Sequence, residues 1–153
     1  MYDMYHENIQ EVINKYSYTV YIVKLNKEIK CSCRDHGSNQ PNPRCPICLG
    51  TGYKIKIYPL VGASQTSTIP ATFRQESELL ITMNFYFLEN RLVERDDILV
   101  DRDKIYNVYQ VSKHTGFHGR PCYSKLSCIP KKLDSKIFMQ NFNRIVGGYD
   151  RKQ

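Results

Sequence analysis

Alternation of apolar and polar residues marks several β-strands along the chain. The clearest example is 78–88, where Ile81, Met83, Phe85 and Phe87 fall on one face. Because successive side chains of a strand point to opposite sides, this pattern predicts a strand with one face in a hydrophobic core. Runs rich in β-branched and aromatic residues predict further strands at 18–25, 53–60, 98–100, 105–111 and 122–129, with hairpin turns at 101–104 and 112–121.

Apolar residues at three- and four-residue spacing predict a helix near each end. The stripe of the first helix, 3–16, is formed by Tyr5, Ile9, Val12, Ile13 and Tyr16. It is expected to pack on the body of the domain, with docking onto a neighbouring subunit as the alternative. The second helix follows Asp134 or Ser135 as its cap, has the stripe Phe138, Phe142 and Ile145, and is expected to stop at Gly147-Gly148. Small residues make 61–72 an expected flexible connection.

Together these elements predict a mainly β fold with terminal helices. It is a small antiparallel β-barrel or sandwich with an inserted four-cysteine zinc-binding hairpin module. The expected domains are an N-terminal helix and first strand (1–24), a zinc-knuckle module inserted in the fold (25–58), and a β-barrel core with a C-terminal helix (59–153).

The module rests on four cysteines. Cys31 and Cys33 form a C-x-C pair, and Cys45 and Cys48 form a C-x-x-C pair after eleven intervening residues. Two such pairs, joined by a turn-rich loop, can place four thiolates around one tetrahedral Zn²⁺. Free or disulfide-bonded cysteines are the alternative, and His36 could replace one ligand. Four cysteines fill every position on the metal, so the predicted zinc is structural rather than catalytic.

The N-terminal residues lack the basic start and apolar run of a signal peptide. No stretch approaches the roughly 20 apolar residues that a membrane-spanning helix needs. We therefore expect no membrane association and synthesis in a reducing cytosol, where disulfides are rare. This expectation favours a metal over disulfides for the four clustered cysteines.

The chain is basic, with a formal charge of +7, and the charge is distributed in blocks. Residues 24–58 carry seven basic and two acidic side chains, and 113–136 carry six and one. The stretch 89–103 carries six acidic and three basic side chains. The first basic block suits nucleic acid, or it offsets the charge of four metal-bound thiolates. Alternating blocks also suit head-to-tail contact between copies of the chain.

Other reactive side chains show no catalytic pattern. Cys122 and Cys128 are expected to be buried thiols, and His114 and His118 have no nucleophile or carboxylate partner in sequence. The acidic run 94–103 lacks the spacing and glycine of a calcium loop, so it is expected to be a solvated hairpin. These features argue against an enzyme.

Two resemblances add to this picture. The motif at Cys45, Cys48, Gly50 and Gly52 resembles the C-x-x-C-x-G-x-G zinc-binding repeat of the DnaJ chaperone family, although the chain holds one such repeat and no J-domain signature. This resemblance extends only the metal-knuckle interpretation to the two cysteines.

The stretch 79–135 resembles the small β-barrel head–tail connector, stopper or head-closure proteins of tailed bacteriophages. The shared feature is a D-I-L, turn, Y-x-V hairpin, here 97–99 and 106–108. The resemblance implies a non-enzymatic structural protein of the virion neck, made in the host cytoplasm. It would form a homo-oligomeric ring between the portal or adaptor protein and the tail or terminator proteins, with non-specific contact to channel DNA. The alternative is a zinc-ribbon nucleic-acid-binding or regulatory protein that uses 24–58, with Tyr53 and Tyr58 as stacking partners.

Overall fold

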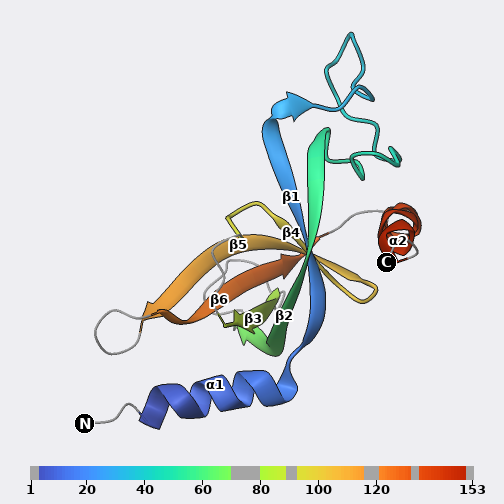
Figure 1. Ribbon diagram of the computed structural model, residues 1–153. Helices are drawn as coiled ribbons and strands as arrows, with labels where there is room; N and C mark the ends of the chain where they lie inside the picture. Colours follow the sequence, from blue (N-terminus) through green and yellow to red (C-terminus); the bar gives the residue numbers. More distant parts are fainter. Residues whose placement is uncertain (1–3, 70–79, 89–92, 116–120, 132–134, 151–153) are drawn as a thin grey trace. The chain divides into compact units, whose positions relative to one another are not determined.

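The computed structural model describes residues 4–69, 80–88, 93–115, 121–131 and 135–150 (Figure 1). Its elements are α1 (Met4–Tyr16), β1 (Tyr18–Lys30), β2 (Tyr53–Ile69), β3 (Leu80–Phe87), β4 (Ile98–Asp101), β5 (Lys104–Thr115), β6 (Pro121–Pro130) and α2 (Ser135–Asp150). The strands close into a barrel in the order β1-β2-β3-β6-β5-β4. The predicted fold class, mainly β with a helix at each end, is therefore confirmed.

The barrel encloses one hydrophobic core. Phe85 and Phe87 of β3 are fully buried, as their place on the predicted apolar face requires. The ring of Phe85 meets the ring of Tyr106 edge to face, with 5.9 Å between the centroids. The other buried members of the core are Val20, Ile22, Val93, Leu99, Val108, Leu126 and Cys128. β1, β3, β4, β5 and β6 thus contribute through inward-pointing residues, and the partly buried Leu60 of β2 packs against them.

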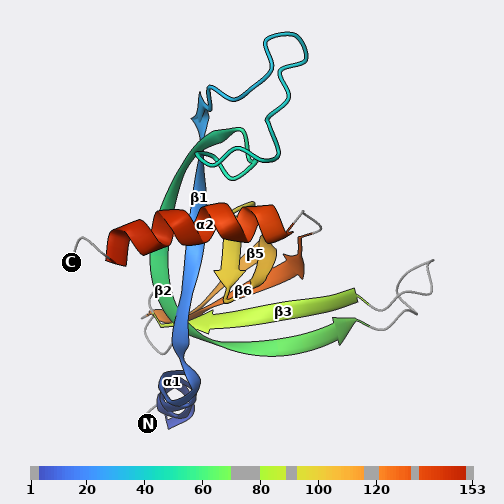
Figure 2. The same ribbon diagram turned by 90° about the vertical axis from the view of Figure 1, so that its right-hand side faces the viewer.

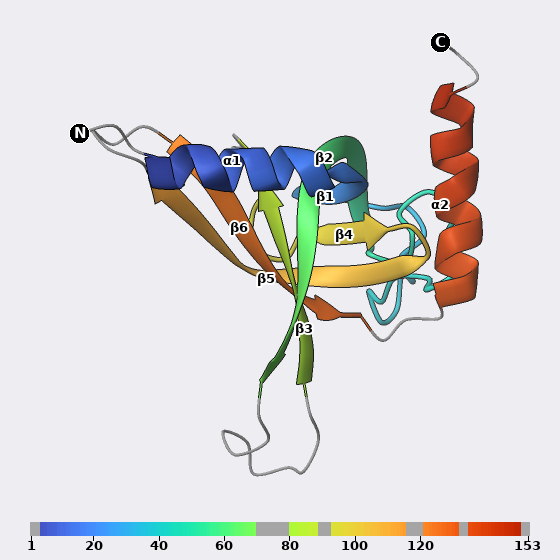
Figure 3. The ribbon, with the colours of Figure 1, turned by 90° about the horizontal axis from the view of Figure 1, so that it is seen from below.

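β2 is longer than its sequence suggests. It continues through Pro59 to Ile69 and pairs with β3 from Gly62 opposite Phe87 to Ile69 opposite Leu80 (Figure 3). The flexible connection predicted at 61–72 is therefore wrong as far as residue 69, and its last three residues lie outside the described part. A Cβ at Gly62 would fall on the Phe87 ring and 2.6 Å from the Tyr86 carbonyl oxygen. The small residue serves close packing between two strands.

The hairpin of β4 and β5 is confirmed, but part of its acidic run is buried. Asp97 is 5% exposed, and its Oδ2 accepts a hydrogen bond from the Glu94 N–H at 2.9 Å. Asp101 is 8% exposed, and its Oδ2 accepts a hydrogen bond from the Tyr18 hydroxyl at 2.9 Å. The predicted solvated hairpin is therefore wrong for these two carboxylates, because Asp97 caps the turn before β4 and Asp101 is tied to Tyr18 of β1.

Both terminal helices are present, with differences in detail. α2 runs through Gly147 and Gly148 to Asp150, so the predicted stop is wrong. Gly147 does not take the left-handed backbone conformation of a helix cap, and a glycine in a helix interior costs only about 1 kcal/mol. In α1, Ile13 is buried, whereas Val12 and Tyr16 are more than half exposed. Of the three stripe residues whose side chains are described, only Ile13 is buried.

The chain forms two compact units. We call Met1–Ile22 with Tyr58–Lys131 the barrel unit, and Val23–Ile57 with Lys132–Gln153 the module unit. The module unit therefore combines the cysteine-bearing hairpin with α2, whose Phe138 and Phe142 are buried and stack at 6.2 Å. Neither of the two described helices has the length and apolar character to cross a membrane.

Candidate metal centre

The four cysteines predicted as ligands come together in the module unit. Their Sγ atoms all lie within 4.8 Å of one another. Cys31 Sγ is 3.9 Å from Cys45 Sγ, and Cys33 Sγ is 3.5 Å from Cys48 Sγ. All four are free thiols, so none of them forms the disulfide that was the alternative to a metal site. Each close pair joins one C-x-C cysteine to one C-x-x-C cysteine, as a single shared site requires.

These distances fit a tetrahedral metal site. A metal–sulfur bond of about 2.3 Å in tetrahedral geometry separates neighbouring sulfur atoms by about 3.8 Å. The Cys33–Cys48 and Cys31–Cys45 sulfur separations, 3.5 and 3.9 Å, bracket that value. The four thiols are therefore arranged so that they could hold one metal ion and leave no open coordination position.

The backbone around the site depends on two glycines. Gly50 and Gly52 have φ angles of 81° and 80°, in the left-handed region that glycine adopts without strain. A Cβ at Gly50 would lie 2.8 Å from the Pro43 carbonyl oxygen, so the turn has no room for a side chain. The N–H of Gly52 points to Cys48 Sγ at 3.4 Å, and its carbonyl accepts the Cys31 N–H at 2.9 Å. Gly52 thereby links both cysteine pairs where β1 ends and β2 begins (Figures 1 and 2).

Arg34 holds the loop between the two pairs. Its Nε donates to the Gly52 carbonyl at 2.7 Å, and its Nη1 donates to the Asn39 carbonyl at 2.8 Å. The guanidinium carbon lies 4.6 Å from the centroid of the Tyr53 ring. In sequence, Arg34 was only one of the basic residues of 24–58. No local pattern reveals its role, because its strongest contact lies 18 residues away.

The thiols of the site differ in acidity. Burial raises the pKa of Cys48 to about 12 and also raises the pKa of Cys33. Burial acts in the same direction on Cys45, but hydrogen bonds from the backbone N–H groups of Cys48 and Ile47 outweigh it and lower that pKa to about 7. Because the metal ligand is the thiolate, the charge of a bound cation is needed to hold Cys48 in its ligand form at neutral pH.

The other sequence candidates lie away from this cluster. His36 is exposed and is not among the four clustered side chains. Cys128 is buried in the barrel core, where burial raises its pKa to about 12. The His114 ring stacks on the Tyr123 ring at 4.5 Å. His118 and the side chain of Cys122 lie outside the described part. Among the described residues, the cysteines form the one cluster of three or more metal-ligating side chains.

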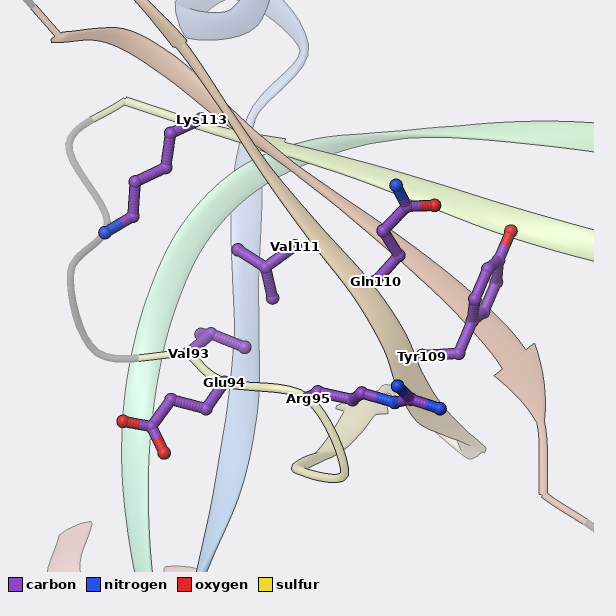
Figure 4. Close-up of a pocket in the computed structure, with 7 residues that line it drawn as sticks. All are labelled: Val93, Glu94, Arg95, Tyr109, Gln110, Val111 and Lys113. Atoms are coloured by element: carbon purple, nitrogen blue, oxygen red, sulfur yellow. The ribbon is translucent and has the colours of Figure 1, made fainter.

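The barrel unit also has an open groove beside β5 (Figure 4). Val93 and Val111 contribute apolar surface, and Tyr109, Gln110 and Lys113 line it from the strand. The Glu94 carboxylate and the Arg95 guanidinium extend in opposite directions (Figure 4). The titratable side chains in the lining are Glu94, Arg95, Tyr109 and Lys113.

No protein-family model matches the chain, and no curated protein is significantly similar to it.

Replacing Arg34 by lysine is expected to weaken the module. Lysine keeps the charge but loses the two-pronged donation to Gly52 and Asn39 and the flat contact with Tyr53. Hydrogen bonds from a charged group contribute about 1.5–3 kcal/mol to stability. Because Arg34 is half-exposed, we expect the substitution to lower the free energy of unfolding by about 1–2 kcal/mol. The measurement is the free energy of unfolding of the metal-loaded protein. Arg44→Lys is the matched control, since Arg44 is exposed and should change stability by less than about 0.5 kcal/mol. Equal effects of the two substitutions would contradict the role of Arg34.

Proposed function

We propose that Cys31, Cys33, Cys45 and Cys48 bind one structural Zn²⁺. The cation would supply the charge that keeps four clustered thiolates together, and the closed set of ligands would leave it no catalytic role. The proposal is supported by the sulfur separations of 3.5 and 3.9 Å, which suit a tetrahedral centre. It is also supported by the small apolar content of the loop 31–52, in which Leu49 is a buried aliphatic residue. A loop of this kind needs a metal to order it.

We further propose that the chain is a non-enzymatic structural protein of the neck of a tailed bacteriophage. In this proposal it forms a homo-oligomeric head-to-tail connector ring that bridges the portal or adaptor protein and the tail or terminator proteins. It is made in the host cytoplasm and resides in the virion. The observation that carries the proposal is a small closed barrel in which the D-I-L, turn, Y-x-V hairpin is a central element.

The geometry of that hairpin explains why its residues belong together. Leu99 pairs with Tyr106, and both are buried in the barrel core. The N–H of Val108 donates to the Asp97 carbonyl at 2.9 Å, which extends the pairing by one step beyond β4. The Asp97 carboxylate caps the preceding turn through the Glu94 N–H. The motif residues thus build one side of the barrel and its entry turn, a structural use that suits a protein without an active site.

The zinc-ribbon alternative assigned base stacking to Tyr53 and Tyr58. One face of the Tyr53 ring is already covered by the Arg34 guanidinium at 4.6 Å. Arg34 is in turn held by two backbone carbonyls, so it is not poised to move aside. This arrangement weighs against base stacking on that face of Tyr53.

The ring is testable with the purified, metal-loaded full chain. We expect closed rings in negative-stain micrographs, and an oligomer in mass photometry whose fraction rises with protein concentration. Addition of the cognate portal or adaptor ring should stabilise the oligomer. A chain that stays monomeric to about 100 μM, alone and with the portal ring, would contradict the connector proposal, whatever its affinity for DNA.

A further inference from the structure

The positive charge of the protein is concentrated in one of its two units. The module unit comprises 57 of the 153 residues and contains twelve basic and four acidic side chains, a formal charge of +8. The barrel unit contains ten basic and eleven acidic side chains, a formal charge of −1. This division is hidden in the sequence, because each unit is assembled from two separate stretches. A formal charge of this size on a small unit indicates an anionic partner.

Most of the charges in the hairpin of this unit are exposed. The exposed basic residues are Lys27, Lys30, Arg44, Lys54 and Lys56, and the exposed acidic residues are Glu28 and Asp35. Lys54 and Lys56 share a face of β2, since Ile55 and Ile57 on the other face are half-buried and fix the orientation of the strand. Zinc bound by four thiolates has a formal charge of −2, which would leave the unit at about +6. The charge of the metal centre therefore does not account for the basic surface.

The described part of the acidic stretch 89–103 has little excess of exposed negative charge. Two of its carboxylates, Asp97 and Asp101, are buried and accept hydrogen bonds within the unit. Its exposed acidic residues are Glu94, Asp96 and Asp103, and the exposed basic residues beside them are Arg95, Arg102 and Lys104. Without Lys104, which lies outside 89–103, the described exposed charges of this stretch sum to −1. The described part of the stretch thus offers little net negative charge for head-to-tail contact between copies of the chain.

We infer that the module unit binds the phosphate backbone of duplex DNA without reading its sequence. Exposed lysines on ordered strands can neutralise phosphates, and such contacts position a protein on DNA while carrying no sequence information. Of the two rings expected to stack on bases, Tyr53 is covered by Arg34 on one face. This inference rests on the proposed connector role and assigns the contact with channel DNA, which the phage resemblance implies, to particular residues. It can be tested on the purified protein whether or not rings form.

The test compares two double variants that each remove two exposed lysines. Lys30→Gln with Lys54→Gln removes charge from the module unit, and Lys104→Gln with Lys113→Gln removes the same charge from the barrel unit. Binding of the metal-loaded protein to a fluorescent 30-base-pair duplex of arbitrary sequence is measured by anisotropy at several salt concentrations. We expect the module variant to bind at least about tenfold more weakly at 100 mM salt, and its slope of log K against log salt to be shallower by about two.

The control variant should bind within about twofold of the unmodified chain and keep its salt slope. A second duplex of unrelated sequence should bind equally well. Equal weakening in both double variants, or no binding of the unmodified chain at 50 mM salt, would overturn the inference and leave an acidic protein as the partner of the module unit. DNA binding by a chain that forms no rings would sustain this inference while removing the connector proposal. Rings without DNA binding would sustain the connector proposal and overturn this inference.

Discussion

Replacing Cys48 by serine is expected to weaken zinc binding at least a hundredfold. Cys48 is fully buried among the other three thiols, and serine does not provide a thiolate. Structural zinc contributes about 10–16 kcal/mol in small modules, so one of four comparable ligands accounts for about 3 kcal/mol or more. This corresponds to at least a hundredfold loss of zinc affinity. Metal analysis of the unmodified chain should find one zinc per chain, and a competition titration with a chelator should report the loss.

The matched control is Cys128→Ala, which removes an equally buried thiol from the barrel core. It should retain one zinc per chain and lose only some barrel stability through the lost side-chain contacts. In the metal-free Cys48→Ser protein, hydrogen exchange should accelerate at the N–H groups of Cys31 and Gly52 while the core strands stay protected. Iron in place of zinc would identify a different metal at the same site. A folded, metal-free wild-type protein with four reactive thiols would contradict the metal centre altogether.

Replacing Gly62 by alanine is expected to lower the free energy of unfolding by about 2–3 kcal/mol. The new Cβ would fall on the buried Phe87 ring and close to the Tyr86 carbonyl oxygen, which belongs to the backbone of the paired strand. Neither group can move without disturbing the barrel core. Denaturant unfolding with an unchanged m-value would give the difference in stability.

Two companion variants make the Gly62 prediction specific. Gly147→Ala adds the same methyl group where no atom lies within 4 Å, in a helix, and should stabilise the protein by about 0.5–1 kcal/mol. Combining Gly62→Ala with Phe87→Leu should cost less than the sum of the two single substitutions, because the ring clash is relieved while the Tyr86 carbonyl remains. A Gly62→Ala protein as stable as the unmodified chain would show that β2 and β3 do not approach as closely as the structure has them.

Local patterns in the sequence were sufficient for the regular elements and for the ligands. Strict alternation on β3 predicted that Phe85 and Phe87 point into the core, because the strand repeat leaves no other way to bury both rings. The spacing of the cysteine pairs predicted a four-thiol cluster, since a short knuckle can present two thiols to one metal and a turn-rich loop can return the chain. These features depend on residues that are close in sequence.

Features that depend on distant residues were not accessible in this way. Gly62 and its neighbours suggested a flexible connection, because the Phe87 ring that requires a glycine there lies 25 positions along the chain. The local sequence around Asp97 and Asp101 suggested a solvated hairpin. Their burial could not be predicted from it, because it depends on how the preceding turn folds and on Tyr18 from another strand. Arg34 looked like a surface charge until its partners Gly52 and Asn39 were in place.

The sequence by itself determined the mainly β composition, the terminal helices and the four candidate ligands, because periodicity and spacing are local properties. Only the tertiary structure decided that the strands close into a barrel and that α2 belongs to the same unit as the cysteines. The same division placed the excess positive charge in the module unit. The physical reason is that burial, pairing and net charge per unit are properties of residues brought together by folding, and the chain order separates them.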